Sequence, residues 1–331
     1  MSVLYVQEQG ACIHKAGGRL LVKKQGSTLG YAHLRDLDRL VLVGAVEVST
    51  PAMAALLDGG IDMVLLSAGG RLRGRLAARE SKNVDLRHTQ FQRYEETGFR
   101  LAMARTIVAG KIRNARFLVQ RFGRNHAEVD VEAAVAALDR SRHRLDDQPD
   151  AAAVLGVEGD AARVYFEAFG RMLLGGFTFT VRSRRPPRDP ANALLSFGYA
   201  VLEGEVTAAL AGEGLDPTVG MLHELDYGRP SLSLDLLEEF RQPVVDRLVL
   251  SLVNRRVLRE EHFEAGSEGG VRMNDAGRPL FIEFYHRAMA SEFEDRTAGE
   301  RTTFTGIIRR QARRMRLALA DGSAYEPFGQ R

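Results

Sequence analysis

The stretch GVEGDAARVYFEAFGRM, residues 156–172, organises the rest of this chain. Its apolar residues recur at steps of three and four, which predicts a helix with one face turned toward a core. Those residues are Ala161, Ala162, Tyr165, Phe166 and Phe169. Glu158 stands between two glycines, at what we expect to be the loosened start of this helix. A buried carboxylate without a partner is costly, so Glu158 must meet solvent, a hydrogen-bond donor or a cation.

A second stretch carries one histidine and a cluster of acids: GMLHELDYGRPSLSLDLLEEFRQPVVDRLV, residues 220–249. Asp235 and Glu238 are three positions apart on an expected helix, so both can point the same way. The turn residues before them suit a loop that folds His223 back toward that helix, and Glu158 would complete the set. One imidazole with two or three carboxylates suits Mg²⁺ or Mn²⁺. Such spacing also arises by chance, so ordinary structural residues remain the alternative interpretation.

Length and composition indicate a globular protein of two domains. The chain has 331 residues, of which 45% are apolar and 27% are charged, a balance typical of such proteins. No apolar run reaches the ~18 residues that span a bilayer, and no signal-peptide pattern opens the chain. A single cysteine, Cys12, cannot form an internal disulfide. We therefore expect a cytoplasmic protein with no membrane partner.

The sequence changes character near residue 88, which predicts an α+β protein of two domains. Residues 1–87 contain short β-type runs separated by turn signals, with one short helix beginning near Pro51. They hold no catalytic constellation, so we expect a β-rich dimerisation domain. Residues 88–331 are expected to form an all-helical catalytic domain that binds metal and DNA. Within it we expect a hairpin turn at residues 275–277 and a frayed end over residues 322–331.

Four separate stretches of the sequence together resemble the universal CRISPR-associated endonuclease, the integrase of CRISPR spacer acquisition. They are AGKIRNARFLVQR (109–121), GVEGDAARVYF (156–166), RRPPRDPANALLSFGYAVL (184–202) and the stretch 220–249. The resemblance covers most of the chain, in the order expected for the family. It implies an N-terminal β-sandwich-like domain followed by a C-terminal helical domain.

The resemblance also implies roles for individual residues. The catalytic glutamate of the family falls on Glu158, its histidine on His223 and its third acidic metal ligand on Glu238. Asp235 matches a second acid whose role is less certain, so it is a further possible ligand. Asp160 departs from the family pattern, in which a small uncharged residue is commoner at that position.

The activity implied by this family is the insertion of short duplex DNA into a CRISPR repeat array. A free 3′-hydroxyl attacks a phosphodiester at a repeat boundary, with Mg²⁺ or Mn²⁺ as cofactor, and hydrolysis of DNA is the side reaction. The implied partners are double-stranded DNA, a second copy of the chain in a homodimer, and a small ferredoxin-like CRISPR-associated protein in a heterohexamer-type complex. Two rivals remain: a structure-specific DNA repair nuclease and a non-catalytic DNA-binding scaffold.

Arginines gather in two segments, although the net charge is only +3. Basic clusters on separate segments favour a polyanionic partner. We predict contacts with the DNA backbone for Arg182, Arg184, Arg185, Arg188, Arg309, Arg313 and Arg316. In the alternative interpretation, these arginines pair with acids such as Asp189 and Glu203 and serve only the fold.

Overall fold

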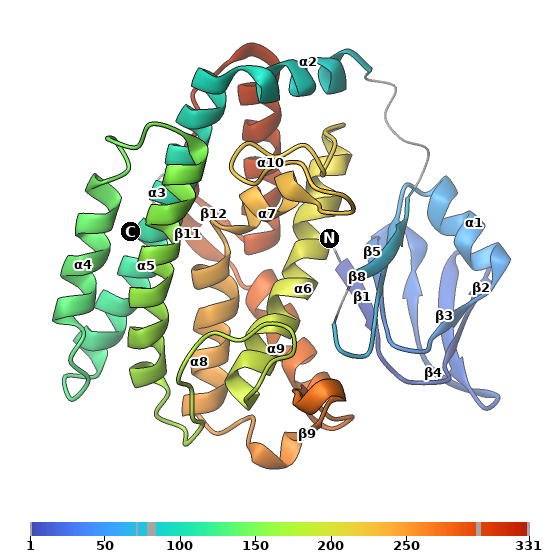
Figure 1. Cartoon of the computed structure of the whole chain (residues 1–331). Helices are drawn as coiled ribbons and strands as arrows, with labels where there is room; N and C mark the ends of the chain where they lie inside the picture. The colour runs from blue at the N-terminus through green and yellow to red at the C-terminus, as the bar shows by residue number, and fades with distance from the viewer. Residues whose placement is uncertain (1, 71, 78–83, 296–298, 330–331) are drawn as a thin grey trace. The chain divides into compact units, whose positions relative to one another are not determined.

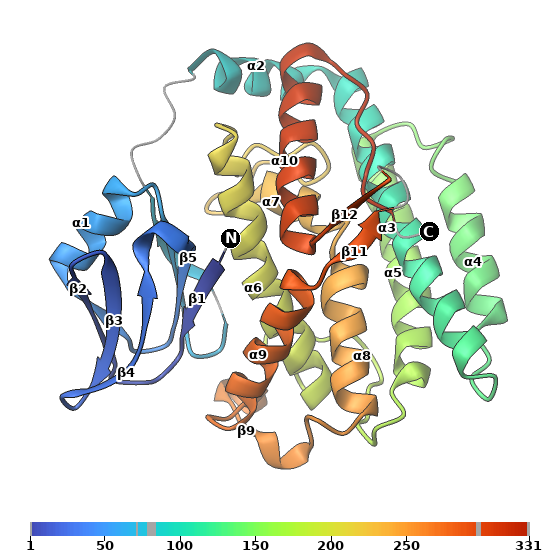
Figure 2. The same ribbon diagram turned by 180° about the vertical axis from the view of Figure 1, so that it is seen from behind.

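The computed structural model describes residues 2–70, 72–77, 84–295 and 299–329 (Figure 1 and Figure 2). The chain divides into two compact units, residues 1–81 and 82–331. The first is rich in strands and the second is mostly helical, so the predicted α+β class is confirmed. Arg71 and residues 78–83, which fall within the expected β-rich domain 1–87, lie outside the described residues.

Two four-stranded sheets make up the first unit. One has the order β1 (Ser2–Val6), β5 (Leu37–Val43), β7 (Asp62–Leu66), β8 (Leu72–Leu76), and the other has the order β4 (Ser27–His33), β3 (Arg19–Lys24), β2 (Cys12–Ala16), β6 (Glu47–Val48). A 3₁₀ turn, η1 (Leu34–Asp36), leads into β5, and helix α1 (Thr50–Asp58) connects β6 to β7. The central strand β5 pairs in parallel with β1 and β7, and its near-continuous apolar run is typical of such strands.

The two sheets share one hydrophobic core. Leu40 of β5, Ile13 of β2 and Leu20 of β3 are fully buried in it, together with Leu56 of α1. A proline in the first turn of α1 fits the helix start, where a missing N–H costs nothing. This arrangement agrees with the expected β-sandwich-like domain.

Helices dominate the second unit. They are α2 (Val84–Glu95), α3 (Thr97–Asn125), α4 (Glu132–His143), α5 (Ala151–Met172), α6 (Pro190–Gly212), α7 (Ser231–Leu237), α8 (Arg247–Asn254), α9 (Gly277–Ala290) and α10 (Phe304–Asp321). A π-helical segment, η2 (Arg241–Asp246), separates α7 from α8 at Pro243, where the sequence predicted an interruption. Short 3₁₀ turns, η3 (Glu260–His262) and η4 (Ser267–Gly269), precede α9.

Helix α6 packs against α7, α8, α10 and η2 of the helical unit. By length and hydropathy this helix could cross a membrane, but 72% of its apolar window is buried within the protein, as in the core helix of a folded domain. It is therefore the core helix of this unit. Its side chain cap is Asp189, which accepts a hydrogen bond from the N–H of Asn192 at 2.8 Å.

The structure corrects the predicted start of the helix that carries Glu158. Helix α5 begins at Ala151, because Asp150 caps it by accepting a hydrogen bond from the N–H of Ala153 at 2.8 Å. The alanines that follow are strong helix formers and outweigh the two glycines. Glu158 therefore lies inside the helix, two turns from its start, where the backbone holds the side chain firmly in direction.

Two further predictions for the helical unit are wrong. The turn at residues 275–277 joins no strands, since Asn274 caps the start of α9 with its side-chain oxygen. Strand β10 (Val271–Met273) pairs instead with the earlier β9 (Phe263–Ala265), and β11 (Phe293–Asp295) pairs with β12 (Glu300–Thr302). The unit is thus mostly rather than entirely helical. Residues 322–329 are not frayed, because Tyr325 and Phe328 are buried; residues 330–331 lie outside the described residues.

Candidate active site

Two carboxylates from different elements meet one lysine in the helical unit. Lys111 of α3 donates a hydrogen bond to Glu158 Oε1 of α5, and its Nζ lies 2.6 Å from Oε2 of Glu238, just after α7. Glu238 is buried and Glu158 is half-buried. Helices α3 and α5 pack side by side, so the fold brings both acids onto the same positive charge. Asp160, which departs from the family pattern, pairs with the exposed Arg144 at 3.1 Å instead.

Asp235 holds His223 rather than facing the two acids. Its Oδ1 lies 2.7 Å from His223 Nδ1 and accepts the backbone N–H of His223 at 3.0 Å. Its Oδ2 accepts the backbone N–H groups of Met221 and Leu222. Since a carboxylate only accepts hydrogen bonds, Nδ1 carries a proton, and in the neutral imidazole Nε2 is then the accepting nitrogen. The structure thus assigns Asp235, fully buried, to the orientation of the imidazole.

Glycines make this loop geometry possible. A Cβ on Gly220 would lie 2.9 Å from Oδ2 of Asp235 and 2.8 Å from the backbone of Ser231, closer than side chains tolerate. Gly228 has a φ of 70°, in the left-handed region that favours glycine. The loop therefore returns to α7 as the sequence predicted, and it places His223 beside the acids.

Cations set the charge of Glu238. Burial alone would raise its pKa, but the Arg241 guanidinium, 3.0 Å away, and the Lys111 ammonium lower the pKa to about 2, with a smaller effect from His223. Burial disfavours the charged form of Lys111, yet Glu238 and Glu158 together raise its pKa above the usual value. Glu238 and Lys111 are therefore both charged at neutral pH.

The donor set fits a hard divalent cation. Within the described residues, no three His, Cys, Asp or Glu side chains are grouped closely enough to hold a metal ion as they stand. Instead, the nitrogen of Lys111 lies between Glu158 and Glu238 and contacts both carboxylates. Two carboxylates already converge on one positive charge, and the imidazole of His223 has a free accepting nitrogen beside them. Oxygen and imidazole donors of this kind suit Mg²⁺ or Mn²⁺.

Next to these charged residues in sequence, Glu239 forms a separate buried group of hydrogen bonds with uncharged donors. Glu239, next to Glu238 in sequence, accepts hydrogen bonds from the Tyr325 hydroxyl, from the N–H of Phe328 at 2.8 Å and from Gln311 at 2.9 Å. Burial raises the pKa of Glu239 to about 7, although these donors act to lower it. Asn114, one turn after Lys111, donates to the backbone oxygens of Glu239 and Phe328. This group fastens residues 325–328 to the two elements that carry the site, and sequence reasoning missed it.

A second buried group joins the site to α5 and α6. The hydroxyls of Tyr165 and Tyr199 both donate to Asp246, the former at 2.6 Å. Burial raises the pKa of Asp246 to about 6, against the effect of these donors and of nearby arginines. The guanidinium of Arg241 lies 4.5 Å from the ring centroid of Tyr199 while it pairs with Glu238. Arg241 is thus held between the charged site and this group.

The arginines of residues 182–188 divide into anchored and free side chains. Arg182 donates to Asn192 at 2.7 Å and Ser196 at 3.0 Å, and Arg188 donates to two backbone oxygens. Arg184 and Arg185 are exposed, and among the described residues neither side chain has a hydrogen-bond or ion-pair partner. Arg182 and Arg184 line a cavity of about 30 Å³ together with Glu158 and Lys111, so this segment does border the site.

In the second arginine cluster, on α10, two side chains pair with acids. Arg310 pairs with Asp295 and Glu300, and Arg316 pairs with Glu213 at 3.1 Å. Arg309 also has a partner. Arg313 is exposed and unpaired in the part of the chain that the structure describes. The DNA contacts predicted for both clusters stay predictions. The exposed side chains without a partner among the described residues, Arg184, Arg185 and Arg313, are the best candidates for them.

The chain is similar to known proteins over its whole length. A protein-family model described as "CRISPR associated protein Cas1" matches residues 4–287. The CRISPR-associated endonuclease Cas1 3 of Thermus thermophilus is 38% identical over 334 residues, covering 100% of this chain and 98% of that protein.

Solved structures show the same fold. A casposase bound to an integration product has a TM-score of 0.87 at 22% identity and covers all of this chain and 94% of that one. A Cas6–RT–Cas1–Cas2 complex gives a TM-score of 0.84 at 23% identity, covering all of this chain and 36% of that one. At these identities the likeness supports the fold alone.

Proposed function

Because this chain belongs to the Cas1 family of CRISPR-associated endonucleases, we propose that it cuts and joins DNA with an active site formed by Glu158, His223 and Glu238. As a Cas1 endonuclease and integrase of CRISPR spacer acquisition, it acts on DNA. The observation that carries the proposed site is the convergence of Glu158 and Glu238 on one positive charge, with His223 oriented beside them.

In the proposed reaction, the 3′-hydroxyl of a short DNA duplex attacks a phosphodiester at the boundary of a CRISPR repeat. Its oxygen forms a new bond to phosphorus as the bond from that phosphorus to the 3′-oxygen of the neighbouring nucleotide breaks, and this oxygen leaves as a free 3′-hydroxyl with the proton lost by the attacking group. Glu158, Glu238 and Nε2 of His223 would hold Mg²⁺ or Mn²⁺. When bound, such an ion polarises the phosphoryl oxygen and offsets the charge of the transition state. The same residues acting with water as nucleophile would hydrolyse DNA.

The surrounding residues have separate roles in this proposal. Asp235 keeps the proton of His223 on Nδ1 and so keeps Nε2 available. Lys111 and Arg241 bring two positive charges to the acids, and each has further N–H groups with which to bind phosphate oxygens. The exposed guanidiniums of Arg184 and Arg185 would contact the backbone of the DNA that enters the site.

A strand-joining assay tests the site. We expect Glu158→Gln, His223→Ala and Glu238→Gln each to abolish insertion of a labelled duplex into a repeat-bearing plasmid, in protein shown to be folded by circular dichroism. Glu238→Gln should also lower the melting temperature, because it removes the buried carboxylate that pairs with Lys111 and Arg241. Glu167→Gln is the matched control, because Glu167 lies on the same helix but is exposed and pairs with Arg163. Joining retained in all three variants would refute the site. Cutting without joining in the unchanged protein would favour a repair nuclease.

We also propose the assembly that the family resemblance implies. Residues 1–87 would hold two copies of the chain together, and the homodimer would bind a small ferredoxin-like CRISPR-associated protein in the cytoplasm. The β-rich unit supports this role, since its sheets carry none of the proposed catalytic residues. A soluble dimer formed by residues 88–331 alone in light scattering would contradict it.

A further inference from the structure

A buried carboxylate that the proposed reaction does not use lies next to the active site. Asp246, at the end of η2, is fully buried and accepts hydrogen bonds from the hydroxyls of Tyr165 of α5, at 2.6 Å, and Tyr199 of α6. Both tyrosines are buried, and both line the cavity of about 30 Å³ that Glu158 and Lys111 also line. The cluster formed by Asp246 and the two tyrosines therefore borders the site.

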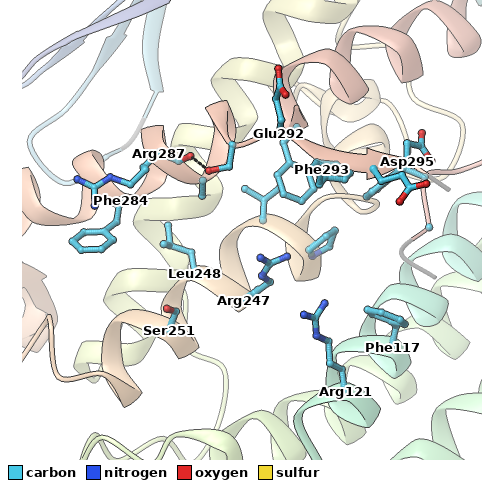
Figure 3. Close-up of a pocket in the computed structure, with 18 of the residues that line it drawn as sticks. Phe117, Arg121, Arg247, Leu248, Ser251, Phe284, Arg287, Glu292, Phe293 and Asp295 are labelled. Atoms are coloured by element: carbon cyan, nitrogen blue, oxygen red, sulfur yellow. Dashed lines mark hydrogen bonds between the residues drawn. The ribbon is translucent and has the colours of Figure 1, made fainter. Parts of the chain in front are cut away.

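The π-helical form of η2 brings Asp246 onto the same face as Arg241. Residues five apart in an α-helix are separated by about 140° around its axis, whereas in a π-helix they lie about one turn apart. Pro243 and Val244, inside the same segment, instead line the larger cavity of about 590 Å³ shown in Figure 3. Arg241 and Asp246 lie outside the lining of that cavity. The segment thus has two faces, and the one with Arg241 and Asp246 is turned toward Tyr199.

Tyr199 connects Asp246 to two arginines. The guanidinium carbon of Arg241 lies 4.5 Å from the centroid of the Tyr199 ring, and that of Arg182 lies 5.5 Å from the same centroid. Both distances are within the range in which a cation is attracted to an aromatic ring. Because the Tyr199 hydroxyl donates to Asp246, the ring cannot move away from these cations without breaking that hydrogen bond.

The placement of Arg241 matters for the site because its other neighbour is Glu238. Nε of Arg241 lies 3.0 Å from Oε2 of Glu238, and the arginine side chain is 12% exposed. A guanidinium has five N–H donors, so it can bind phosphate oxygens while it also pairs with a carboxylate. An arginine side chain has many rotamers, so one fixed geometry requires that the guanidinium be held from its other side. The Tyr199 ring supplies this second contact.

We propose that Asp246 is a positioning residue for the reaction: through Tyr199, it holds the guanidinium of Arg241 against Glu238 in the orientation that binds a phosphate of the DNA. Tyr165 fixes the other carboxylate oxygen of Asp246 from α5, the helix that carries Glu158. The proposal rests on the proposed function in that Glu238 is a metal ligand for strand joining.

Strand-joining rates measured over a range of DNA concentrations test this role. Asp246→Leu removes both acceptors at similar volume, and it should lower kcat about tenfold to a hundredfold, as the loss of an orienting residue does. KM for the DNA should change by less than about threefold, because the exposed arginines would make most of the phosphate contacts. Asp246→Asn should keep kcat within about threefold, since its amide can accept from one tyrosine hydroxyl and donate to the other.

Substitutions of Tyr199 separate its ring from its hydroxyl. Tyr199→Leu removes the ring and should lower kcat as much as Asp246→Leu does. Tyr199→Phe keeps the ring and loses only the donor, so its effect should be smaller. Leu319→Ala is the matched control, because it opens a cavity at a fully buried position of α10 and so destabilises the fold. It should leave kcat unaltered at a temperature at which the protein is folded.

A double-variant cycle shows whether Asp246 acts through Arg241. In an Arg241→Ala background, Asp246→Leu should lower kcat by less than about a further twofold, because the group that Asp246 positions is already absent. The same cycle is measured on the free energy of unfolding, without DNA. There the destabilisation of the double variant should be smaller than the sum of the two single ones. If Asp246→Leu does not fold, Tyr199→Phe takes its place in both cycles.

The proposal is overturned if Asp246→Leu joins DNA at the unchanged rate, or if its loss multiplies in full with that of Arg241→Ala. It is also overturned if Leu319→Ala, at an equal loss of melting temperature, lowers kcat as much as Asp246→Leu does, since the effect would then be one of stability alone. If the unchanged protein joins no DNA, the proposed function fails, while the unfolding cycle still decides whether Asp246 positions Arg241.

Discussion

Glu238 and Glu239 are neighbours in sequence but face two different regions of the molecule. Glu238 meets Lys111 and Arg241, and these cations hold its pKa at about 2. Glu239 meets the neutral donors of residues 311–328, and burial raises its pKa to about 7. The contrast teaches that burial alone does not create a reactive carboxylate. At Glu238, two cations stabilise the charged carboxylate. At Glu239, hydrogen bonds from neutral donors attach residues 325–328 to the helical unit.

The strongest test of this contrast is the same substitution at both positions. We expect Glu238→Gln to lower strand joining by at least about a thousandfold, because the amide removes an anionic ligand. Glu239→Gln should keep joining within about threefold, since an amide can still hydrogen-bond to its neighbours. Initial rates of joining, measured at equal concentrations of folded protein, check this. Equal losses in the two variants would remove the distinction between the regions.

Asp246 extends the comparison, since it too is buried among neutral hydroxyl donors. Its folded-state pKa of about 6 exceeds the usual 3.8. The protonated form is therefore favoured by folding, and this contribution is present below pH 3.8 and is lost as the pH rises through 6. The loss amounts to about 3 kcal/mol. Asp246→Asn should lack this decline. The difference in unfolding free energy between the two proteins, measured by denaturation at each pH, should therefore change by this amount between pH 3.8 and 6. Identical pH dependence in both proteins would contradict the assignment.

Asp235→Asn is expected to have an intermediate effect. Asparagine can accept fewer hydrogen bonds from His223 and the backbone around it, so the imidazole is oriented less well. Residues that orient metal ligands usually contribute tenfold to a hundredfold. We therefore expect joining to fall by about that factor, with a smaller loss than in Glu238→Gln. A loss as large as that of Glu238→Gln would make Asp235 a ligand.

The smallest effect concerns DNA contacts at the free and anchored arginines. Arg184→Ala/Arg185→Ala should flatten the salt slope of duplex binding by about two, equally for all DNA sequences. Arg182→Ala should instead lower the melting temperature, because Arg182 donates to Asn192 and Ser196. Binding isotherms at four salt concentrations separate the two. An unchanged slope in the double variant would show that neither arginine contacts the DNA backbone.

Much of the fold was readable from the sequence because its signals are local. Strand runs bounded by turns, and helices with apolar residues at steps of three and four, depend on neighbouring residues. The candidate ligands Glu158, His223 and Glu238 were found through the resemblance, and the fold brings them near each other.

The rest depends on contacts between distant parts of the chain. No local pattern marks Lys111 as part of the site, because its pairing with Glu158 joins positions 47 residues apart. The end of the chain has no helical period, so its attachment through Glu239, 86 residues from Tyr325, was invisible. The start of α5 was misjudged because two glycines drew more weight than the cap at Asp150. Local pattern cannot reveal such partners.

A calorimetric titration with Mn²⁺ tests most directly the central claim that Glu238, and not Glu239, is a metal ligand. The unchanged protein and Glu239→Gln should each bind one ion with the same affinity, and Glu238→Gln should bind at least about tenfold more weakly. Because the experiment needs no DNA, it reads the ligand set apart from joining activity. Binding retained by Glu238→Gln and lost by Glu239→Gln would contradict the account.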